Sequence, residues 1–205
     1  MAYLAADERR RQIVDAAVEI MAADGLAGTT TRKVAERADA PLGAIHYCFR
    51  NKEELIHLVM ERGAALLQDA FAQVDPSRGI EATIRASIAA MWDWYQQDIG
   101  LQMALTEAGM VRIRRGGDPA EVYAVWDPFG RVLLTDNLRL AVKAEGREPA
   151  ISVEEIVRFV LHRFDGMTLE YAASHDRAAC QRQIDLLADA MVLLALPETT
   201  PGAAR

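Results

Sequence analysis

"TTTRKVAERADAPLGAIHYCFRNKEEL", residues 29–55, places two short helical patterns on either side of a tight turn. Thr30 is a good N-cap for the first helix, because its side chain can accept a bond from a free amide of the first turn. Asp39 suits the turn, since Asp tolerates left-handed backbone better than most residues. Pro41 then suits the start of the second helix. The stretch therefore predicts a helix–turn–helix.

Two short helices joined by a tight turn cannot bury much surface alone. Ile45 and Phe49, at i and i+4, point to an inward face that needs a partner. Residues 7–24 supply one, because their apolar residues follow the spacing of an amphipathic helix that Gly25 closes; these are Ile13, Ala16, Ala17, Ile20 and Met21. We expect a three-helix unit of the kind that puts its last helix into the major groove of DNA. An ordinary helical hairpin inside an all-α core is the alternative that this pattern leaves open.

The rest of the chain also reads as helix. Capping signals stand at Asn51 with Glu54, at Asp118 before Pro119, at Ser152 with Glu155 and at Asp176. We expect helices over 51–73, 80–97, 101–113, from 119 onward, over 152–173 and over 176–196, with a kink at Asp127-Pro128. Strand-type alternation is nearly absent. The predicted fold class is all-α, with about nine helices.

Composition and charge narrow the function classes. The 205 residues are 51% hydrophobic with a formal net charge of −7, as in a soluble globular protein. No apolar run approaches the roughly 18 residues that span a membrane. The two cysteines, Cys48 and Cys180, form no disulfide framework, so we expect a cytoplasmic protein. Residues 1–52 carry 8 Lys and Arg against 7 Asp and Glu, whereas the remainder carries 15 against 23, so the N-terminal quarter is where a polyanion is least repelled.

Residues 24–55 resemble the N-terminal domain of the tetracycline-repressor (TetR) family of bacterial transcription regulators. The resemblance rests on Gly25, the Thr pair before Arg32, Val34-Ala35, Gly43, Ile45, Phe49 and the "NKEEL" motif at 51–55. The sequence departs from the family pattern at Asp39, Pro41 and His46, where Gly, Ser or Thr, and Tyr are commoner. The resemblance implies a DNA-binding domain over 7–55 that continues into the helix at 52–73. It also implies an effector-binding and dimerisation domain over 74–197, and we expect a disordered tail at 198–205.

Carried onto this sequence, the family's DNA contacts imply roles for eight residues. Thr31 and Lys52 lie where a hydroxyl and an ammonium meet phosphates. Arg32 lies where a guanidinium can reach a base edge or the backbone. The groove-facing side of the second short helix comprises Leu42, Gly43, Ala44, His46 and Tyr47. Because few of these side chains form hydrogen bonds to bases, much of the specificity is expected from Arg32 and from DNA shape.

Aromatic and Met residues gather in the middle of the chain and on the penultimate helix. At helical spacing such residues are usually core, and that interpretation stays open for each of them. The family resemblance implies an effector cavity among the middle helices, and a mostly apolar box with few polar groups is typical of small-molecule sites. The candidate ligand-binding residues are Trp92, Tyr95, Met103, Trp126, Phe129, His162 and Phe164.

The last two predicted helices each carry a wide apolar face. Two such faces exceed what we expect one subunit to cover, which favours a four-helix bundle across a two-fold axis. The candidate dimer-interface residues are Val157, Val160, Leu161, Ile184, Leu187 and Met191. The family resemblance implies the same homodimer.

Other chemistry is weakly represented. No catalytic or phosphate-binding motif is present, so we expect neither an enzyme nor a cofactor. His57 and Glu61 are spaced as a metal pair, but without a third ligand a solvated helix face is favoured. Cys48 lies near basic residues and could be a redox-sensitive thiolate, although a small apolar core residue is favoured. The arginines at 9–11 fit phosphate contacts and a solvated face equally well.

These patterns favour a repressor released from a palindromic DNA operator by a small apolar or aromatic effector. The alternative is a constitutive or architectural DNA-binding protein that has no small-molecule effector.

Overall fold

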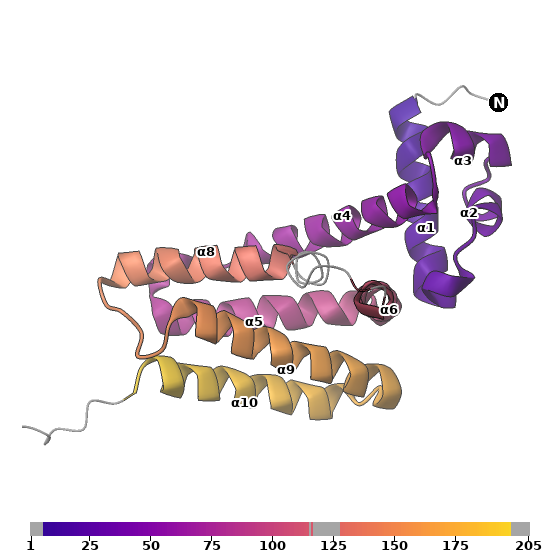
Figure 1. The fold of residues 1–205 in the computed structure, drawn as a ribbon. Coiled ribbons are helices and arrows are strands. Elements are labelled where there is room, and N and C mark those ends of the chain that lie inside the picture. The colour runs from indigo at the N-terminus through magenta and orange to yellow at the C-terminus, as the bar shows by residue number, and fades with distance from the viewer. Residues whose placement is uncertain (1–5, 115, 117–127, 198–205) are drawn as a thin grey trace, which may run out of the picture. The chain divides into compact units, whose positions relative to one another are not determined.

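The computed structural model describes residues 6–114, 116 and 128–197, without the side chains of residues 6, 52, 53, 112, 128 and 129. Within these ranges the regular elements are nine α-helices and one short 3₁₀ helix, η1 (Figure 1). Their bounds are α1 Ala6–Gly28, α2 Thr31–Arg37, α3 Leu42–Cys48, α4 Lys52–Phe71, η1 Pro76–Arg78, α5 Ile80–Gln97, α6 Ile99–Arg114, α8 Pro128–Glu145, α9 Val153–Ser174 and α10 Arg177–Ala195. The all-α prediction is confirmed. No helix in the described ranges is both long and apolar enough to cross a bilayer.

The helix starts follow the capping residues that the sequence indicates. Thr30 accepts a hydrogen bond from the Lys33 amide at 3.2 Å, and Asp176 accepts one from the Ala179 amide at 2.8 Å. Ser152 and Glu155 form both bonds of a capping box at the start of α9. Each cap satisfies an amide that the first turn of a helix leaves without an internal partner.

Some predicted boundaries differ from the structure, and others fall outside the described residues. α6 begins at Ile99 rather than Leu101, because Asp98 caps it by accepting the Leu101 amide at 2.9 Å. The predicted helix start at Pro119, the kink at Asp127-Pro128 and the tail at 198–205 fall wholly or partly on residues that the structure does not describe.

The chain forms two compact units, and α6 belongs to the first. The first unit comprises residues 1–66 and 97–126, and the second comprises 67–96 and 127–205. The sequence-based expectation was a DNA-binding domain over 7–55 that continues into the helix at 52–73, followed by a second domain over 74–197. The core of the first unit joins α1–α4 to α6, and its buried residues are Ile13, Ala16, Ala17, Met21, Val34, Ala35, Ile45, Phe49, Leu55, Val59, Leu101 and Ala104.

A close approach holds α6 against α1. A Cβ added to Gly100 would overlap the carbonyl oxygen of Ala22, so the backbones meet at a distance that only glycine permits. A second tie lies nearer the end of α1, where Gly25 leaves helical geometry with φ 70° and ψ 178°. There the Leu26 amide donates to Glu107 Oε2 on α6 at 2.8 Å.

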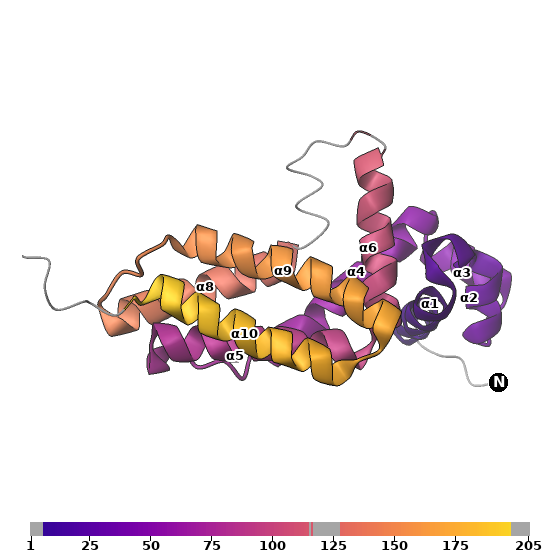
Figure 2. The ribbon, with the colours of Figure 1, turned by 90° about the horizontal axis from the view of Figure 1, so that it is seen from below.

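In the second unit, α5 contacts three other helices. Its first amide, on Ile80, donates to Glu145 Oε2 of α8 at 2.7 Å. Arg85 pairs with Asp189 of α10 at 2.7 Å, and Tyr95 packs on Phe164 of α9. The axes of α5, α8, α9 and α10 run roughly alongside one another in two perpendicular views (Figures 1 and 2).

This packing corrects the predicted dimer interface. All six candidate residues are at least 95% buried within the single chain, namely Val157, Val160, Leu161, Ile184, Leu187 and Met191. The apolar faces of α9 and α10 are covered by helices of the same subunit, so they are core rather than surface available to a second copy.

Candidate nucleic-acid interface

The turn between α2 and α3 has the predicted geometry. Asp39 adopts left-handed backbone with φ 46°, and the Ala40 amide donates to the Ala35 carbonyl at 3.0 Å. Pro41 is the N-cap of α3. The turn lets the apolar side of α3 reach the core while its other side stays open.

The two sides of α3 differ sharply in exposure. Ile45 is 1% exposed and Phe49, just after the helix, is 3% exposed, whereas Leu42 is 46% and Tyr47 86% exposed. The other predicted contact residues on this helix are Gly43 and His46, which are exposed, and Ala44, which is half-buried. The structure thus gathers the five predicted residues on the accessible part of α3.

Gly43 has no packing reason to lack a side chain. A Cβ added there would meet no atom of the chain within 4 Å. Open space above a helical glycine is what close approach of another molecule requires.

The predicted contacts outside α3 are less uniform. Arg32 on α2 is 83% exposed and pairs with Glu36 at 3.1 Å. An exposed pair of this spacing contributes only about 0.3–0.5 kcal/mol, so little opposes its exchange for DNA. Thr31 is the first residue of α2 and is half-buried. Lys52 is the first residue of α4, and its side chain lies outside the described set.

Two further cations hold α2 onto α1. Lys33 pairs with Asp24 at 2.7 Å, and Arg37 pairs with Glu19. Sequence reasoning did not single out these residues, because the carboxylates that engage them lie on a different helix.

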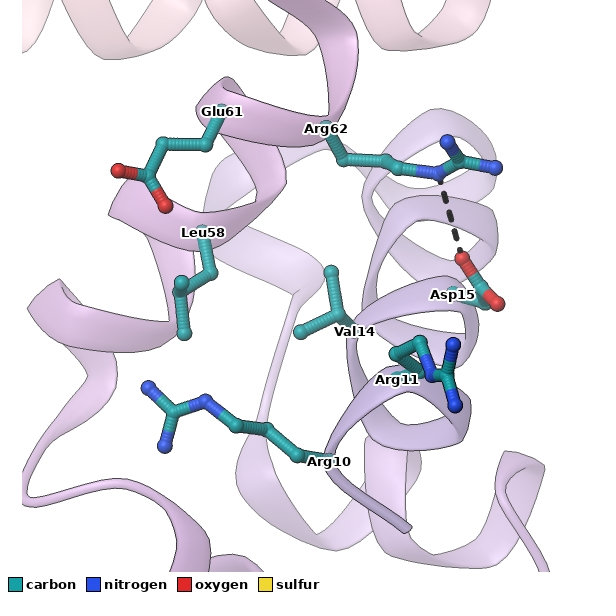
Figure 3. A pocket seen from close by; sticks show the side chains of 7 residues that line it. All are labelled: Arg10, Arg11, Val14, Asp15, Leu58, Glu61 and Arg62. Atoms are coloured by element: carbon teal, nitrogen blue, oxygen red, sulfur yellow. Dashed lines mark ion pairs between the residues drawn. The ribbon is translucent and has the colours of Figure 1, made fainter. Parts of the chain in front are cut away.

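A groove of about 530 Å³ lies between α1 and α4 (Figure 3). Its lining is largely charged and comprises Arg10, Arg11, Val14, Asp15, Leu58, Glu61 and Arg62. Arg62 pairs with Asp15 across it at 3.6 Å. The mixture of signs distinguishes this groove from an apolar effector site.

The second unit contains an aromatic cluster formed by Trp92, Tyr95, Phe164 and Tyr171. Trp92 meets Tyr171 edge-on at 5.4 Å between ring centroids, and Tyr95 lies 5.3 Å from Phe164. Trp92 also donates from Nε1 to Gln181 Oε1 at 2.8 Å. The structure therefore brings together three of the seven predicted ligand residues and adds Tyr171 to them. The sequence did not indicate Gln181, because it lies on α10, 89 residues from Trp92.

Gln96 follows Tyr95 of this cluster directly on α5, and its side-chain oxygen is buried. Oε1 of Gln96 is buried and has no hydrogen-bond partner among the described residues, although the Nε2 of Gln96 donates to the Trp92 carbonyl at 3.3 Å. Buried acceptors of this kind are uncommon and call for a donor.

Two of the other predicted ligand residues, His162 and Met103, do not join the cluster. His162 is exposed, and with 100° per residue it lies nearly opposite the buried Phe164 on α9. Met103 is half-buried on α6 of the first unit. Trp126 and the side chain of Phe129 are outside the described part of the chain.

The outward sides of α9 and α10 carry large apolar residues. Phe159 and Leu169 are 50% and 51% exposed on α9, and Leu186 and Leu193 are 59% and 65% exposed on α10. Gly166 shares the outward side of α9, and a Cβ there would meet nothing within 4 Å. We call these five residues the outer apolar surface.

The remaining reactive groups form no evident site. In the described ranges no cluster of three or more His, Cys, Asp or Glu is placed to hold a metal ion. His57 and Glu61 lie 3.3 Å apart on an exposed face of α4. Cys48 is half-buried at the end of α3.

Comparison with known proteins gives the arrangement a context. The family model for bacterial regulatory proteins of the tetR family matches residues 13–59. The nicotine-responsive transcriptional repressor HdnoR of Paenarthrobacter nicotinovorans is 26% identical over 187 residues, which cover 89% of this chain and 93% of that protein.

Solved structures share the fold along nearly the whole length. A TetR-family member from Streptomyces coelicolor A3 superimposes with a TM-score of 0.65 at 20% identity, covering 89% of this chain and 97% of the other. FadR from Bacillus subtilis, in complex with stearoyl-CoA, gives a TM-score of 0.63 at 16% identity, covering 91% and 97%. At these identities the likeness establishes the fold alone.

Proposed function

The chain belongs to the tetR family of bacterial regulatory proteins, and we propose that it is a transcription repressor released from a palindromic operator by a small apolar or aromatic effector. Its role as a transcriptional regulator follows from the family match and from the relatives. The operator, the effector and the homodimer belong to the proposal.

The exposed side of α3 carries the DNA-binding part of the proposal. A second helix of a helix–turn–helix reads the major groove when its outward residues reach base edges while its inner residues hold it on the domain. Leu42 and Ala44 offer apolar contact to thymine methyl groups, and Gly43 permits close approach. Tyr47, at 86% exposure, is available to donate to a phosphate.

The aromatic cluster supports the effector. Trp92 and Phe164 supply buried apolar surface, and Gln96 Oε1 supplies a buried acceptor without a partner in the described residues. Apolar walls with few polar groups are typical of small-molecule sites. HdnoR is described as nicotine-responsive, and FadR was solved in complex with stearoyl-CoA.

The outer apolar surface supports the homodimer. Phe159, Leu169, Leu186 and Leu193 are each at least half exposed on two adjacent antiparallel helices. A two-fold axis beside them would pair this surface with its own copy in a four-helix bundle. Gly166 would let the two α9 helices approach closely. A dimer would also carry two copies of α3, one for each half-site of a palindromic operator. We propose that the protein acts in the cytoplasm.

A constitutive DNA-binding protein without an effector is the alternative. This alternative is supported by the burial of Trp92 and Phe164, because buried aromatic side chains can serve only to fill the core of the second unit. Gln96 Oε1 argues for the effector, because a core without a ligand would leave that acceptor unpaired.

Repeated selection from a pool of random 30-base-pair duplexes tests the DNA-binding part. The proposal predicts a palindromic sequence with half-sites about one helical turn apart. Recovery of no preferred sequence would rule out specific repression. Native mass spectrometry of gently purified protein then tests the effector part, with a retained apolar molecule as the expected result.

A further inference from the structure

The three consecutive arginines on α1 make different contacts. Arg9 reaches Gln12 at 3.5 Å and Arg11 pairs with Glu8 at 2.7 Å, both within α1. Arg10 instead extends toward other elements, and Figure 3 shows it leaving α1 in a different direction from Arg11. A run of like charges in the sequence therefore contains one residue with a separate structural role.

Arg10 meets both ends of the α3–α4 turn. Its Nη1 donates to the Cys48 carbonyl at 2.6 Å, and its Nη2 lies 3.3 Å from Glu54 Oε1. Its guanidinium also lies over the ring of Phe49, 5.0 Å from the centroid. One side chain thus joins α1, the last turn of α3 and the first turn of α4.

The Cys48 carbonyl is a favourable acceptor for a cation. Carbonyls in the last turn of a helix have no internal partner and carry the negative end of the helix dipole. A guanidinium donor at 2.6 Å therefore holds the C-terminal end of α3 through a charge-assisted bond.

Glu54 is itself fixed at the start of α4. Its amide donates to Asn51 Oδ1 at 2.8 Å, and its Oε2 accepts the Arg50 amide at 2.9 Å. The bond from the Arg50 backbone, with help from Arg10, holds the pKa of Glu54 below its usual value. The carboxylate is consequently a stable anchor for Arg10 at neutral pH.

α3 depends on such anchors because it is short. It has seven residues, of which Ile45 is the buried one. Phe49 follows as the C-cap and is 3% exposed. A helix held by so few apolar contacts needs other contacts to fix its direction. A recognition helix must be held to within about 10–20° of its productive orientation.

We propose that Arg10 is a positioning residue for sequence recognition, which aims the exposed side of α3 through the Cys48 carbonyl and Glu54 and does not itself contact DNA. The inference rests on the proposed function, since it concerns how the same helix reads an operator. A run of basic residues in a DNA-binding domain would ordinarily be assigned to phosphate contacts, and we assign Arg10 to the positioning of α3 instead.

The test compares Arg10→Gln and Arg10→Lys with the matched control Arg11→Gln in the full-length protein. Arg11→Gln removes the same charge from the next position, where the side chain is 72% exposed. For each variant, affinity is measured for the selected duplex and for a scrambled duplex over a range of salt concentrations. Hydrogen exchange of residues 42–49 is measured without DNA.

Arg10→Gln is expected to lower the ratio of selected to scrambled affinity by about tenfold, as for loss of a hydrogen bond from a charged group. Scrambled-duplex affinity and the salt slope should stay unchanged, and exchange over residues 42–49 should rise. Arg10→Lys should behave similarly, because an ammonium lacks the planar fork that reaches both acceptors. Arg11→Gln should alter neither the ratio nor the exchange.

Equal losses on both duplexes, with a salt slope reduced by about one, would make Arg10 a phosphate contact and overturn the proposal. An unchanged ratio, or unfolding of both Arg10 variants, would overturn it too, since unfolding would mean that the contacts serve the domain's stability. If the wild type prefers no sequence, the proposed function fails, and the exchange of residues 42–49 still judges whether Arg10 positions α3.

Discussion

The carboxylate of Glu107 accepts a hydrogen bond from the main-chain amide of Leu26, at 2.8 Å and across 81 residues of sequence. Leu26 follows the left-handed Gly25, where α1 loses helical geometry just before the helix–turn–helix. A side chain of α6 therefore stabilises the point at which the chain leaves α1 for α2. Since α6 follows α5 after the single residue Asp98, the aromatic cluster and this bond are linked by a short stretch of chain.

Glu107→Ala should destabilise the first unit by about 1–3 kcal/mol, because it removes the carboxylate that accepts the Leu26 amide. Glu107→Gln, which keeps an oxygen acceptor at the same place, should cost about 1 kcal/mol or less. Urea unfolding of both variants measures the difference. Equal stability of Glu107→Ala and the wild type would show that the bond adds nothing.

Gly100→Ala should destabilise the protein by about 1–3 kcal/mol through overpacking. The added methyl would meet the Ala22 carbonyl, and a backbone oxygen cannot turn aside as a flexible side chain does. Thermal unfolding is the measurement. A melting temperature that does not fall would mean that α1 and α6 separate easily, against the close approach described above.

Gly43→Ala should separate stability from DNA binding. The new methyl meets open space and replaces a poor helix former, so the free energy of unfolding should rise by up to about 1 kcal/mol. Affinity for the selected duplex should nevertheless fall, since the methyl occupies the space into which DNA is proposed to come. Retained affinity together with raised stability would remove Gly43 from the interface.

Leu186→Glu combined with Leu193→Glu should yield a folded monomer with weakened operator binding, because the charges would be buried without partners between two copies. Leu140→Glu is the control, as Leu140 is 54% exposed on α8 away from the outer apolar surface. Sedimentation velocity distinguishes the species. Dimers that persist in the double variant place the interface on another face.

Gln96→Met should leave the ligand-free protein as stable as the wild type, because it replaces a buried acceptor that lacks a partner in the described residues. The same change should weaken binding of a retained effector that donates a hydrogen bond to this position. Isothermal titration compares the two proteins. Unaltered affinity would exclude Gln96 from the effector site.

The sequence predicted features whose cause is local. Thr30, Asp39 and the Ser152–Glu155 pair act within four residues of the structure they determine, so their spacing alone indicates it. The bonds of Leu26 to Glu107 and of Ile80 to Glu145 join residues 81 and 65 positions apart. Sequence spacing does not predict hydrogen bonds between residues so far apart.

Apolar periodicity has a related limit. It correctly indicated that Val157 and Leu187 are buried, but it does not say which helices bury them. His162 shows the same limit. It is only two residues from Phe164 in sequence, yet it lies on the opposite side of α9.

Ligand-responsive repression is tested most directly by titrating the molecule retained by the protein, with and without a saturating amount of the selected duplex. Tryptophan fluorescence serves as the signal, because Trp92 lies in the aromatic cluster. Binding free energies at two coupled sites are reciprocal, so a molecule that weakens operator binding tenfold must itself bind about tenfold more weakly to the DNA complex, a difference of about 1.4 kcal/mol. That result is the one we predict. Identical affinity for the free protein and the DNA complex would contradict it and would leave a DNA-binding protein that this molecule does not control.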